Sequence, residues 1–277
     1  MTSSMKGVDD APVRFGTLVT ASGHRFGHAT LNAPDSLNAL TLTMVDALQA
    51  QLDQWAEDPR IAGVILDGSG EKAFCAGGDV VGLYRAMREA GAGRVPKDAA
   101  DFFEREYRLD HAIHRYPKQL LVWGHGIVMG GGIGLMAGAS HRVGAPRSRV
   151  AVAGVTLGLD PDVGGSWFLS RLPGRVGRFL ALTGAPLNAA DALWSGLADR
   201  AARAEDRGAL LEAVARTRWT GERASDAETL DDLLRALPAA ELAPSALAAH
   251  RDRIDALIGP HDGLTTPVLS FRGGEIW

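Results

Sequence analysis

The stretch that decides the fold runs Trp123-Gly124-His125-Gly126-Ile127-Val128-Met129-Gly130-Gly131-Gly132-Ile133-Gly134-Leu135-Met136-Ala137. Apolar residues 120–123 predict a buried strand, which ends at two glycines before a glycine triplet leads into an apolar helical run. Glycine has no Cβ, so the backbone here can approach a ligand and leave its N–H groups uncovered. A helix that begins at the triplet adds free N–H groups and the positive end of its dipole. The stretch favours a site for negative charge, although close helix–strand packing also favours glycine.

A second glycine turn follows another strand-like run. Residues 61–67 predict that strand, and Phe74-Cys75-Ala76-Gly77-Gly78-Asp79-Val80 comes after it. Two strand-to-helix turns of this kind can each present one N–H to a single oxygen, which is the geometry of an oxyanion hole for a thioester or another acyl group. The alternative is that both sets of glycines only relieve crowding.

These two segments resemble the two signatures of the crotonase (enoyl-CoA hydratase/isomerase) superfamily. Residues 32–40 (NAPDSLNAL) resemble its first coenzyme A loop. Three further segments are similar to the 3-hydroxyisobutyryl-CoA hydrolase branch: residues 102–118, 158–174 and 181–199. The motifs occur in the family's order. The resemblance implies an α/β fold with a crotonase-type ββα spiral core over residues 1–200 and a short helical C-terminal region over residues 201–277.

By the resemblance, the oxyanion donors are the backbone N–H groups of Gly78 and Gly131. Asp162, in the PDVGG motif, and Glu106, in the FFxxEY motif, are the other predicted catalytic residues. A carboxylate at these positions can orient a substrate hydroxyl or transfer a proton. The plainer alternatives are a loop cap for Asp162 and a solvated helix surface for Glu106.

The other predicted site residues contact the substrate by resemblance alone: Ser36, Leu37, Ala39, Ala76, Asp79, Val80, Gly130 and Gly154. Neither a metal nor a separate cofactor is expected, because coenzyme A enters as part of the acyl-CoA substrate. The resemblance also implies a homo-oligomer, either a trimer or a hexamer.

Two departures from the family's pattern affect the expected chemistry. Hydratases use two glutamates, and the matching positions here are Gly134 and Gly154. The hydrolase branch also has glycine at the first position but keeps a glutamate at the second, and a glycine cannot transfer a proton. The coenzyme A loop also lacks the family's common basic residues near Ala33 and Asp35.

The expected function is binding and hydrolysis of an acyl-CoA thioester. Two alternatives share the fold: an enoyl-CoA hydratase or isomerase, and a catalytically impaired paralogue that only binds acyl-CoA. A dinucleotide-binding domain fits poorly, since three residues rather than two separate Gly126 from Gly130.

Composition limits the remaining classes. The chain has 277 residues, a net charge of −4 and one cysteine, Cys75. The negative charge argues against binding nucleic acid or an anionic membrane, and the lone cysteine fits a reducing compartment. Residues 1–13 have no apolar core like that of a signal peptide, and no segment is long enough to span a bilayer. These features predict a cytoplasmic protein.

Local patterns give further expectations. A hairpin is predicted between residues 15 and 32, and Thr43 with Asp46 predicts a helix start. Asp160 and Asp162, two residues apart, face the same way if their segment is extended. Cys75, between Phe74 and Ala76, is expected to be a small buried residue.

Overall fold

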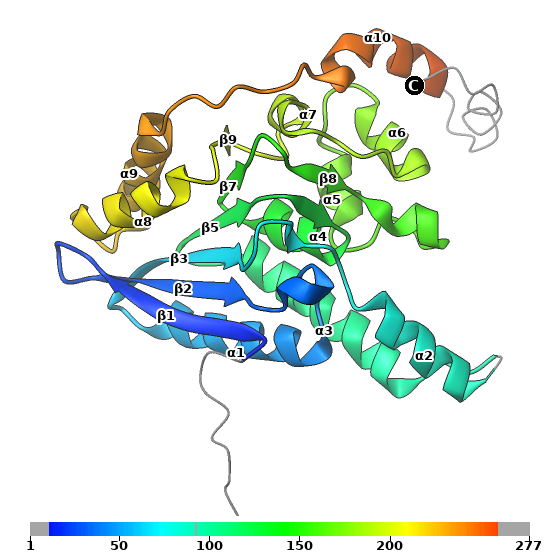
Figure 1. The fold of residues 1–277 in the computed structure, drawn as a ribbon, viewed down its shortest axis with the longest axis horizontal. Coiled ribbons are helices and arrows are strands. Elements are labelled where there is room, and N and C mark those ends of the chain that lie inside the picture. Colours follow the sequence, from blue (N-terminus) through cyan, green and yellow to red (C-terminus); the bar gives the residue numbers. More distant parts are fainter. Residues whose placement is uncertain (1–10, 92, 260–277) are drawn as a thin grey trace, which may run out of the picture.

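A six-stranded sheet in the order β1-β2-β3-β5-β7-β9 forms the centre of the computed structural model, which describes residues 11–91 and 93–259 (Figure 1). Only β1 and β2 are antiparallel, and all other neighbours are parallel. The strands are β1 (Val13–Val19), β2 (Arg25–Leu31), β3 (Ile61–Gly68), β5 (Gln119–Gly124), β7 (His141–Gly144) and β9 (Arg200–Ala201). The predicted hairpin is therefore confirmed.

A small parallel sheet stands beside the large one. Its strands are β4 (Ala73–Cys75), β6 (Ile127–Met129) and β8 (Arg149–Ala151), in that order across the sheet. From β3 onward, one strand joins the large sheet, the next strand joins the small sheet and a helix follows, as in β3-β4-α2 and β5-β6-α4. This repeated ββα unit confirms the spiral core. The short strands β4 and β6 lie inside the two glycine-turn motifs, and the sequence did not predict them as separate strands.

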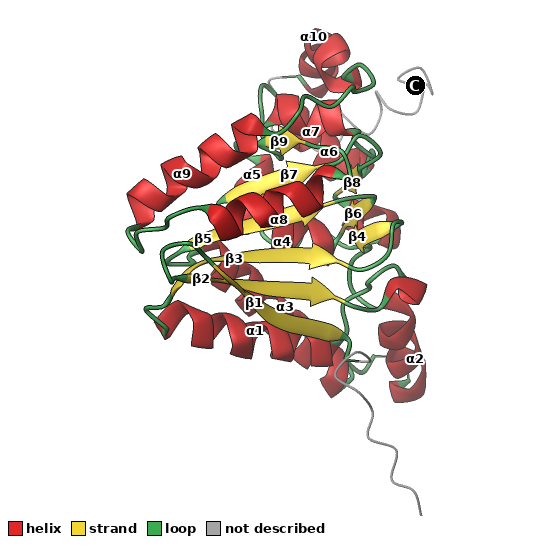
Figure 2. Ribbon diagram, turned by 60° about the vertical axis from the view of Figure 1, so that its left-hand side comes forward, coloured by secondary structure: helices red, strands yellow, loops and turns green. Residues whose placement is uncertain are grey.

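The helices fill the connections and cover the sheets (Figure 2). They are α1 (Leu42–Glu57), α2 (Val80–Ala90), α3 (Lys97–His114), α4 (Gly131–Gly138), α5 (Gly165–Leu169), α6 (Val176–Thr183), α7 (Ala189–Ser195), α8 (Asp206–Arg216), α9 (Arg223–Ala236) and α10 (Ala246–Ile258). Short 3₁₀ turns are η2 (Pro34–Ser36) and η3 (Ala153–Leu157). Among the described residues, no helix has both the length and the apolar character needed to cross a membrane.

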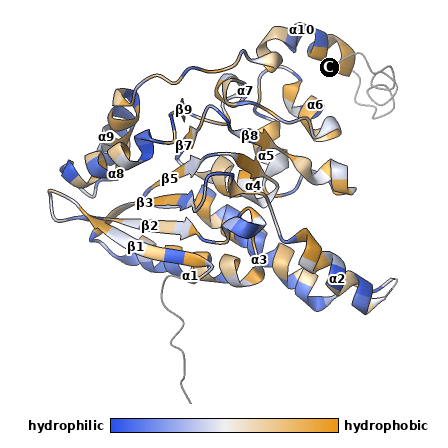
Figure 3. Ribbon diagram, in the orientation of Figure 1, coloured by the Kyte–Doolittle hydropathy of each residue, from blue (hydrophilic) through white to orange (hydrophobic). Residues whose placement is uncertain are grey.

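Both faces of the central strands β3 and β5 are buried, which explains their continuous apolar sequences. In β5, Leu120 and Val122 join the cluster that contains the apolar face of α1, while Leu121 and Trp123 join a second cluster with α8 and α9. Successive side chains of a strand point to opposite faces, so one apolar run supplies both clusters. Figure 3 shows the resulting hydrophobic colours along the central strands.

The helices after residue 200 pack on the rest of the chain in two places. Phe26 of β2 meets Trp219, which follows α8, with ring centroids 4.5 Å apart. At the other end, Ser245 before α10 donates a hydrogen bond to Asp191 of α7, with an O–O distance of 2.7 Å. The boundary at residue 200 stays a prediction. Residues 1–10 of the predicted core and residues 260–277 of the predicted C-terminal region lie outside the described residues. Residues 1–10 are also most of the segment, residues 1–13, for which no signal peptide was predicted.

One local prediction is wrong, and the condition attached to another is not met. Helix α1 begins two residues earlier than predicted, because the Oγ1 of Thr41 accepts a hydrogen bond from Met44 N and so caps the helix. The segment after Asp160 is not extended: it bends through a turn in which Val163 has a φ of +47°. Asp160 and Asp162 therefore do not sit on one face of an extended strand.

Candidate active site

The two glycine turns pack directly against each other. A Cβ placed on Gly77 would lie 3.2 Å from the oxygen of Met129 and 3.6 Å from the nitrogen of Gly131, and one on Gly130 would lie 3.4 Å from the Cα of Gly77. Gly77 and Gly130 also have φ values of +107° and +50°, which side-chain-bearing residues rarely adopt. Glycine is thus required here for both space and conformation.

Two N–H groups on these turns have no acceptor among the described residues. Helix α4 begins at Gly131, whose N–H belongs to the unpaired first turn. The hydrogen bonds of the described residues include none donated by the backbone of Gly78 or of Gly131. The contact of Gly77 with Gly130 and Gly131 places Gly78 and Gly131 on neighbouring turns. Their role as oxyanion donors stays a prediction.

The predicted coenzyme A loop is joined to the first glycine turn by backbone hydrogen bonds. Ala76 N donates to the oxygen of Leu37 over 3.0 Å, and Leu40 N donates to the oxygen of Gly77 over 2.7 Å. The side chain of buried Asn38 fixes the loop through bonds to the oxygens of Ser69 and Ala73. Loop and turn therefore form one continuous surface.

The remaining predicted contact residues differ in how they are placed. Ala39 and Ser36 lie in the loop, and Ser36 is exposed and donates its hydroxyl to Ala33 O. Asp79 caps α2 by accepting a hydrogen bond from Gly82 N, which gives it a structural role, and Val80 after it is 47% exposed. Gly154 is buried in η3, where its Cβ position faces the backbone oxygen of Asp160 at 2.8 Å.

The side chain of Glu106 is buried against the start of α4, so the alternative of a solvated glutamate is wrong. Its side chain comes from α3, and its Oε1 contacts the position that a Cβ on Gly131 would occupy. The residue is 2% exposed and Oε1 has no hydrogen-bond partner in the described part of the chain. Burial, and then the charge of Asp162, raises the pKa of Glu106 to about 8. A carboxyl beside the glycine turns with a pKa near neutrality suits proton transfer.

Asp162 lies in the turn that faces α3. Tyr107 donates its hydroxyl to Oδ2 of Asp162 over 3.0 Å. Burial raises the pKa of Asp162, the bond from Tyr107 opposes that rise, and the charge of Asp160 adds to it. Asp160 itself is exposed. Burial is therefore the larger cause of the raised pKa of Asp162, and the charge of Asp160 is the smaller one.

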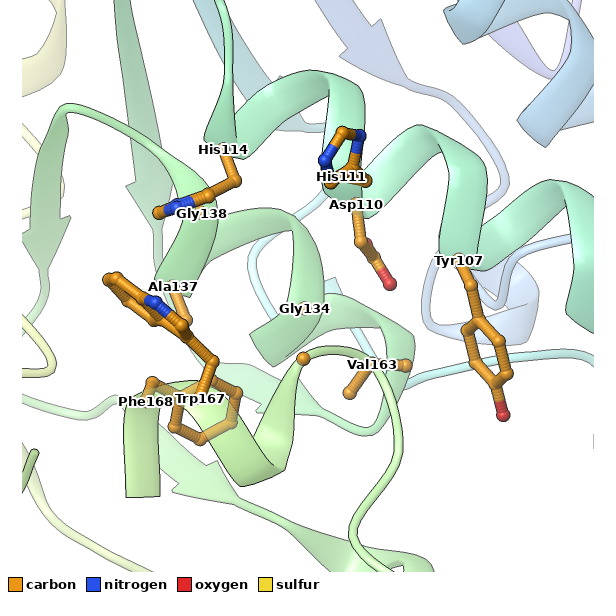
Figure 4. A pocket seen from close by; sticks show the side chains of 11 residues that line it. Tyr107, Asp110, His111, His114, Gly134, Ala137, Gly138, Val163, Trp167 and Phe168 are labelled. Carbon is orange, nitrogen blue, oxygen red and sulfur yellow. The ribbon is translucent and has the colours of Figure 1, made fainter. Parts of the chain in front are cut away.

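Asp110 is a carboxyl that the sequence reading missed. It lies one turn beyond Glu106 on α3, is 7% exposed, and lines a cavity of about 200 Å³ between α3, α4 and the start of α5 (Figure 4). The available signal was spacing: Phe102, Glu106, Leu109 and Asp110 all fall on the buried face of α3. A carboxylate within an apolar helical stripe is a sign of a buried carboxyl.

Other polar groups near the site have structural explanations. Burial raises the pKa of the Cys75 thiol to about 12, so the thiol is a small buried group as expected. His125 is buried, and its Nε2 lies 3.0 Å from the oxygen of Gly70. No group of three or more histidine, cysteine, aspartate or glutamate side chains in the described residues could hold a metal ion.

Residues 26–267 match the family described as enoyl-CoA hydratase/isomerase. The chain belongs to this family. Its sequence is 40% identical over 231 residues to the mitochondrial 3-hydroxyisobutyryl-CoA hydrolase of Xenopus tropicalis, covering 83% of this chain and 58% of that protein. Relatives with that name in other vertebrates match at similar identity, for example 44% over 172 residues in Homo sapiens, covering 62% of this chain and 43% of that protein.

Solved structures show the same crotonase fold. A carnitinyl-CoA dehydratase of Mycobacterium thermoresistibile superposes with a TM-score of 0.81 at 35% identity, covering 96% of this chain and 72% of that one. An enoyl-CoA hydratase of Rhodobacter sphaeroides superposes with a TM-score of 0.74 at 32% identity, covering 95% and 74%. The chain spans about three-fifths of the length of the Xenopus relative, so its activity is a matter for proposal.

Gly154→Glu tests whether position 154 can restore a carboxylate. We expect this crotonase-family chain to lose about 1–3 kcal/mol of stability, because the new Cβ crowds the oxygen of Asp160 and the loop must shift. We also expect faster acyl-CoA turnover than in Gly154→Ala, which carries the same Cβ without the carboxylate. Chemical denaturation and turnover of both variants provide the measurement. Equal rates in the two variants would mean that position 154 does not face the reacting group.

Proposed function

We propose that this protein binds an acyl-CoA and hydrolyses its thioester, which is the reaction for which its 3-hydroxyisobutyryl-CoA hydrolase relatives are named. The observation that carries the proposal is the contact between the two glycine turns, whose N–H groups at Gly78 and Gly131 have no acceptor in the part of the chain that the structure describes. Paired backbone donors that point at one oxygen stabilise the charge that develops there during acyl transfer.

The residues around this contact divide the chemistry between them. The carbonyl oxygen of the thioester accepts from Gly78 and Gly131, which makes its carbon electrophilic. Glu106 in its ionised form takes a proton from the attacking water as the water oxygen bonds to that carbon. The C–S bond then breaks, and the departing thiolate takes up the proton that Glu106 received, which restores the carboxylate. Asp162, held by Tyr107, orients the acyl group.

A thioesterase assay tests the proposal. Purified protein is incubated with 3-hydroxyisobutyryl-CoA, with crotonyl-CoA and with free coenzyme A, while thiol release and enoyl absorbance are followed together. Hydrolysis releases thiol, whereas hydration removes enoyl absorbance and releases none. Acyl-CoA binding by calorimetry without either signal would replace the hydrolase with the impaired paralogue.

Hydration or dehydration is the second candidate. It is favoured by the fold likeness to proteins named as a carnitinyl-CoA dehydratase and an enoyl-CoA hydratase. Against it, glycine occupies positions 134 and 154, where the hydratases carry their glutamates.

Asp162→Asn is expected to lower kcat/KM for 3-hydroxyisobutyryl-CoA by about 10²-fold, while the Kd for free coenzyme A stays within about twofold. The carboxyl of Asp162 accepts a hydrogen bond from Tyr107 of α3, and no hydrogen bond in the described part of the chain joins it to residues 32–40. Steady-state kinetics and calorimetry measure the two quantities, and Asp160→Asn, at the exposed neighbour, is the control. Equal losses in both quantities would assign Asp162 a purely structural role.

We also propose a cytoplasmic homo-oligomer, a trimer or a hexamer. Helix α2 supports an assembly, because Val81, Tyr84 and Met87 expose apolar surface at 59%, 59% and 47%. Light scattering of the purified full chain gives the mass, and a monomer at micromolar concentration would contradict the proposal.

A further inference from the structure

Val163 is held in a conformation that a β-branched residue rarely adopts. Its φ is +47°, in the left-handed region, where a branched Cβ crowds the backbone and glycine fits without strain. The side chain is nevertheless 4% exposed and packs in the larger hydrophobic cluster. Strained residues persist only where the surrounding structure holds them, and they cluster at sites that clamp a ligand. The strain at Val163 therefore directs attention to what its side chain closes.

The side chain of Val163 occupies space that a glycine of α4 leaves open. A Cβ placed on Gly134 would lie 2.7 Å from the Cβ of Val163, which is closer than two side-chain carbons approach. Any larger residue at position 134 would therefore displace the valine. Figure 4 shows Val163 beside Gly134, between Tyr107 and Trp167 in that view. Val163 and Gly134 thus form a matched pair of one large and one small residue.

Val163 lines the cavity of about 200 Å³ at the end that is nearer to the glycine turns. The lining residues of α4 fall within residues 134–138, which follow the N–H donor Gly131 along that helix. Those of α3 fall within residues 107–114, which follow Glu106. On both helices the cavity therefore leads away from the glycine turns, and Val163 meets it at position 134, where it begins.

Beyond Val163 the cavity can accept a carbon chain. Its lining there is mainly apolar and includes Ala137, Trp167 and Phe168. An engineered apolar cavity of about 150 Å³ holds a benzene ring, so a cavity of this size has room for several methylene groups. The space is available in the fold, but the valine stands between it and the glycine turns.

We propose that Val163 sets the length of the acyl chain that this protein hydrolyses, by closing the cavity to the substrate. The carbonyl is at Gly131, and Gly134 lies three residues on, which advances a helix by about 4.5 Å, the extent of an acyl chain of about four carbons. A chain of that length ends at Val163, beside Asp162, whereas a longer chain has to enter the cavity. The substrate class is a short acyl thioester. This inference rests on the proposed hydrolysis.

Chain-length selectivity tests the proposal. The full-length parent, Val163→Gly and Val163→Ala are each given 3-hydroxybutyryl-CoA and 3-hydroxyhexanoyl-CoA, and thiol release gives kcat/KM for each substrate. Glycine suits the positive φ at position 163, so the variant should fold, and circular dichroism checks that it does. Val143→Ala is the matched control, because Val143 is 0% exposed and belongs to the other hydrophobic cluster.

We expect the parent to favour the four-carbon substrate. In Val163→Gly, the ratio of kcat/KM for the six-carbon substrate to that for the four-carbon substrate should rise by about tenfold, because each further buried methylene group contributes about fourfold. Val163→Ala should show a smaller rise, and Val143→Ala should keep the parent's ratio. The ratio is the measured quantity, since a change beside Asp162 also lowers both rates.

A second substitution separates entry into the cavity from a general loosening of the turn. Ala137 lines the cavity and is 7% exposed. Added to Val163→Gly, Ala137→Leu should return the ratio toward that of the parent, because the leucine fills the space that the glycine opened. A loosened turn would keep its raised ratio whatever occupies position 137.

Four results would overturn the proposal: a parent that hydrolyses both substrates equally well, an unchanged ratio in Val163→Gly, the same rise in Val143→Ala, or a rise that Ala137→Leu does not reverse. If Val163→Gly does not fold, Val163→Ala is judged by the same criteria. A parent that releases thiol with an unchanged pattern overturns this inference alone, whereas a parent that releases no thiol from either substrate overturns the proposed hydrolysis as well.

Discussion

We expect replacement of Gly131 by glycolic acid to lower thiol release from an acyl-CoA, the activity proposed above, by about 10²–10³-fold, the usual cost of one oxyanion donor. Glycolate substitutes an ester oxygen for the N–H and adds no side chain. The ester also makes the oxygen of Gly130, which accepts from Ile133 N and Gly134 N, a weaker acceptor. Because the Gly131 N–H has no acceptor among the described residues, the substitution removes no hydrogen bond of the fold. We expect the loss in kcat, since the donor acts mainly on charge that develops in the transition state.

Substitution of Gly131 by another amino acid would change more than the N–H donor. A Cβ on Gly131 would meet Oε1 of Glu106 and would lie 3.0 Å from Cδ1 of Leu40. Alanine or proline would therefore displace the carboxyl as well as crowd the core. The same ester at Gly138, in the last turn of α4, is the control and should lower stability more than kcat. A Gly131 ester that turns over at the parent's rate would remove this N–H from the mechanism.

The glycine turns could be predicted from sequence because their signals are local. A strand that stops at a glycine and a helix that starts beside it leave the same pattern twice, at Gly77-Gly78 and at Gly130-Gly131. What the pattern does not contain is the contact between the turns, in which Gly77 lies against Met129 and Gly130. The parallel pairing of β4 with β6 produces that contact, and both strands have only three residues.

The carboxyls were harder to predict because burial depends on distant segments. Helix α3 is hydrophilic overall, so its glutamates look solvated, yet α4 and the turn at Val163 cover the side that carries Glu106 and Asp110. Asp160 and Asp162 would face the same way only in an extended segment, and this segment is not extended, because Val163 takes a left-handed conformation. Motif spacing located these residues along the chain, but only the packing shows which carboxyls face a cavity.

Glu106→Gln is expected to lower thioester turnover by about 10²–10⁴-fold, because the amide cannot take the proton of the attacking water. Glutamine matches glutamate in size, so the contact with Gly131 is kept. Glu104→Gln is the matched control: that residue lies two positions away on α3 and is exposed. Steady-state kinetics with 3-hydroxyisobutyryl-CoA measures both variants. A variant at position 106 with the parent's kcat would assign the base to another group.

The same substitution changes how stability depends on pH. Burial raises the pKa of Glu106 from 4.5 to about 8, so between these values the folded protein holds a proton that the unfolded chain has released. Stability therefore falls as pH rises through this interval, by up to about 1.4 kcal/mol per pH unit from this group. Asp110, whose pKa is also raised, contributes in the same direction. Denaturation at several pH values should show a smaller decline for Glu106→Gln than for the parent or Glu104→Gln. If all three decline equally, Glu106 does not carry the shifted proton in the folded protein.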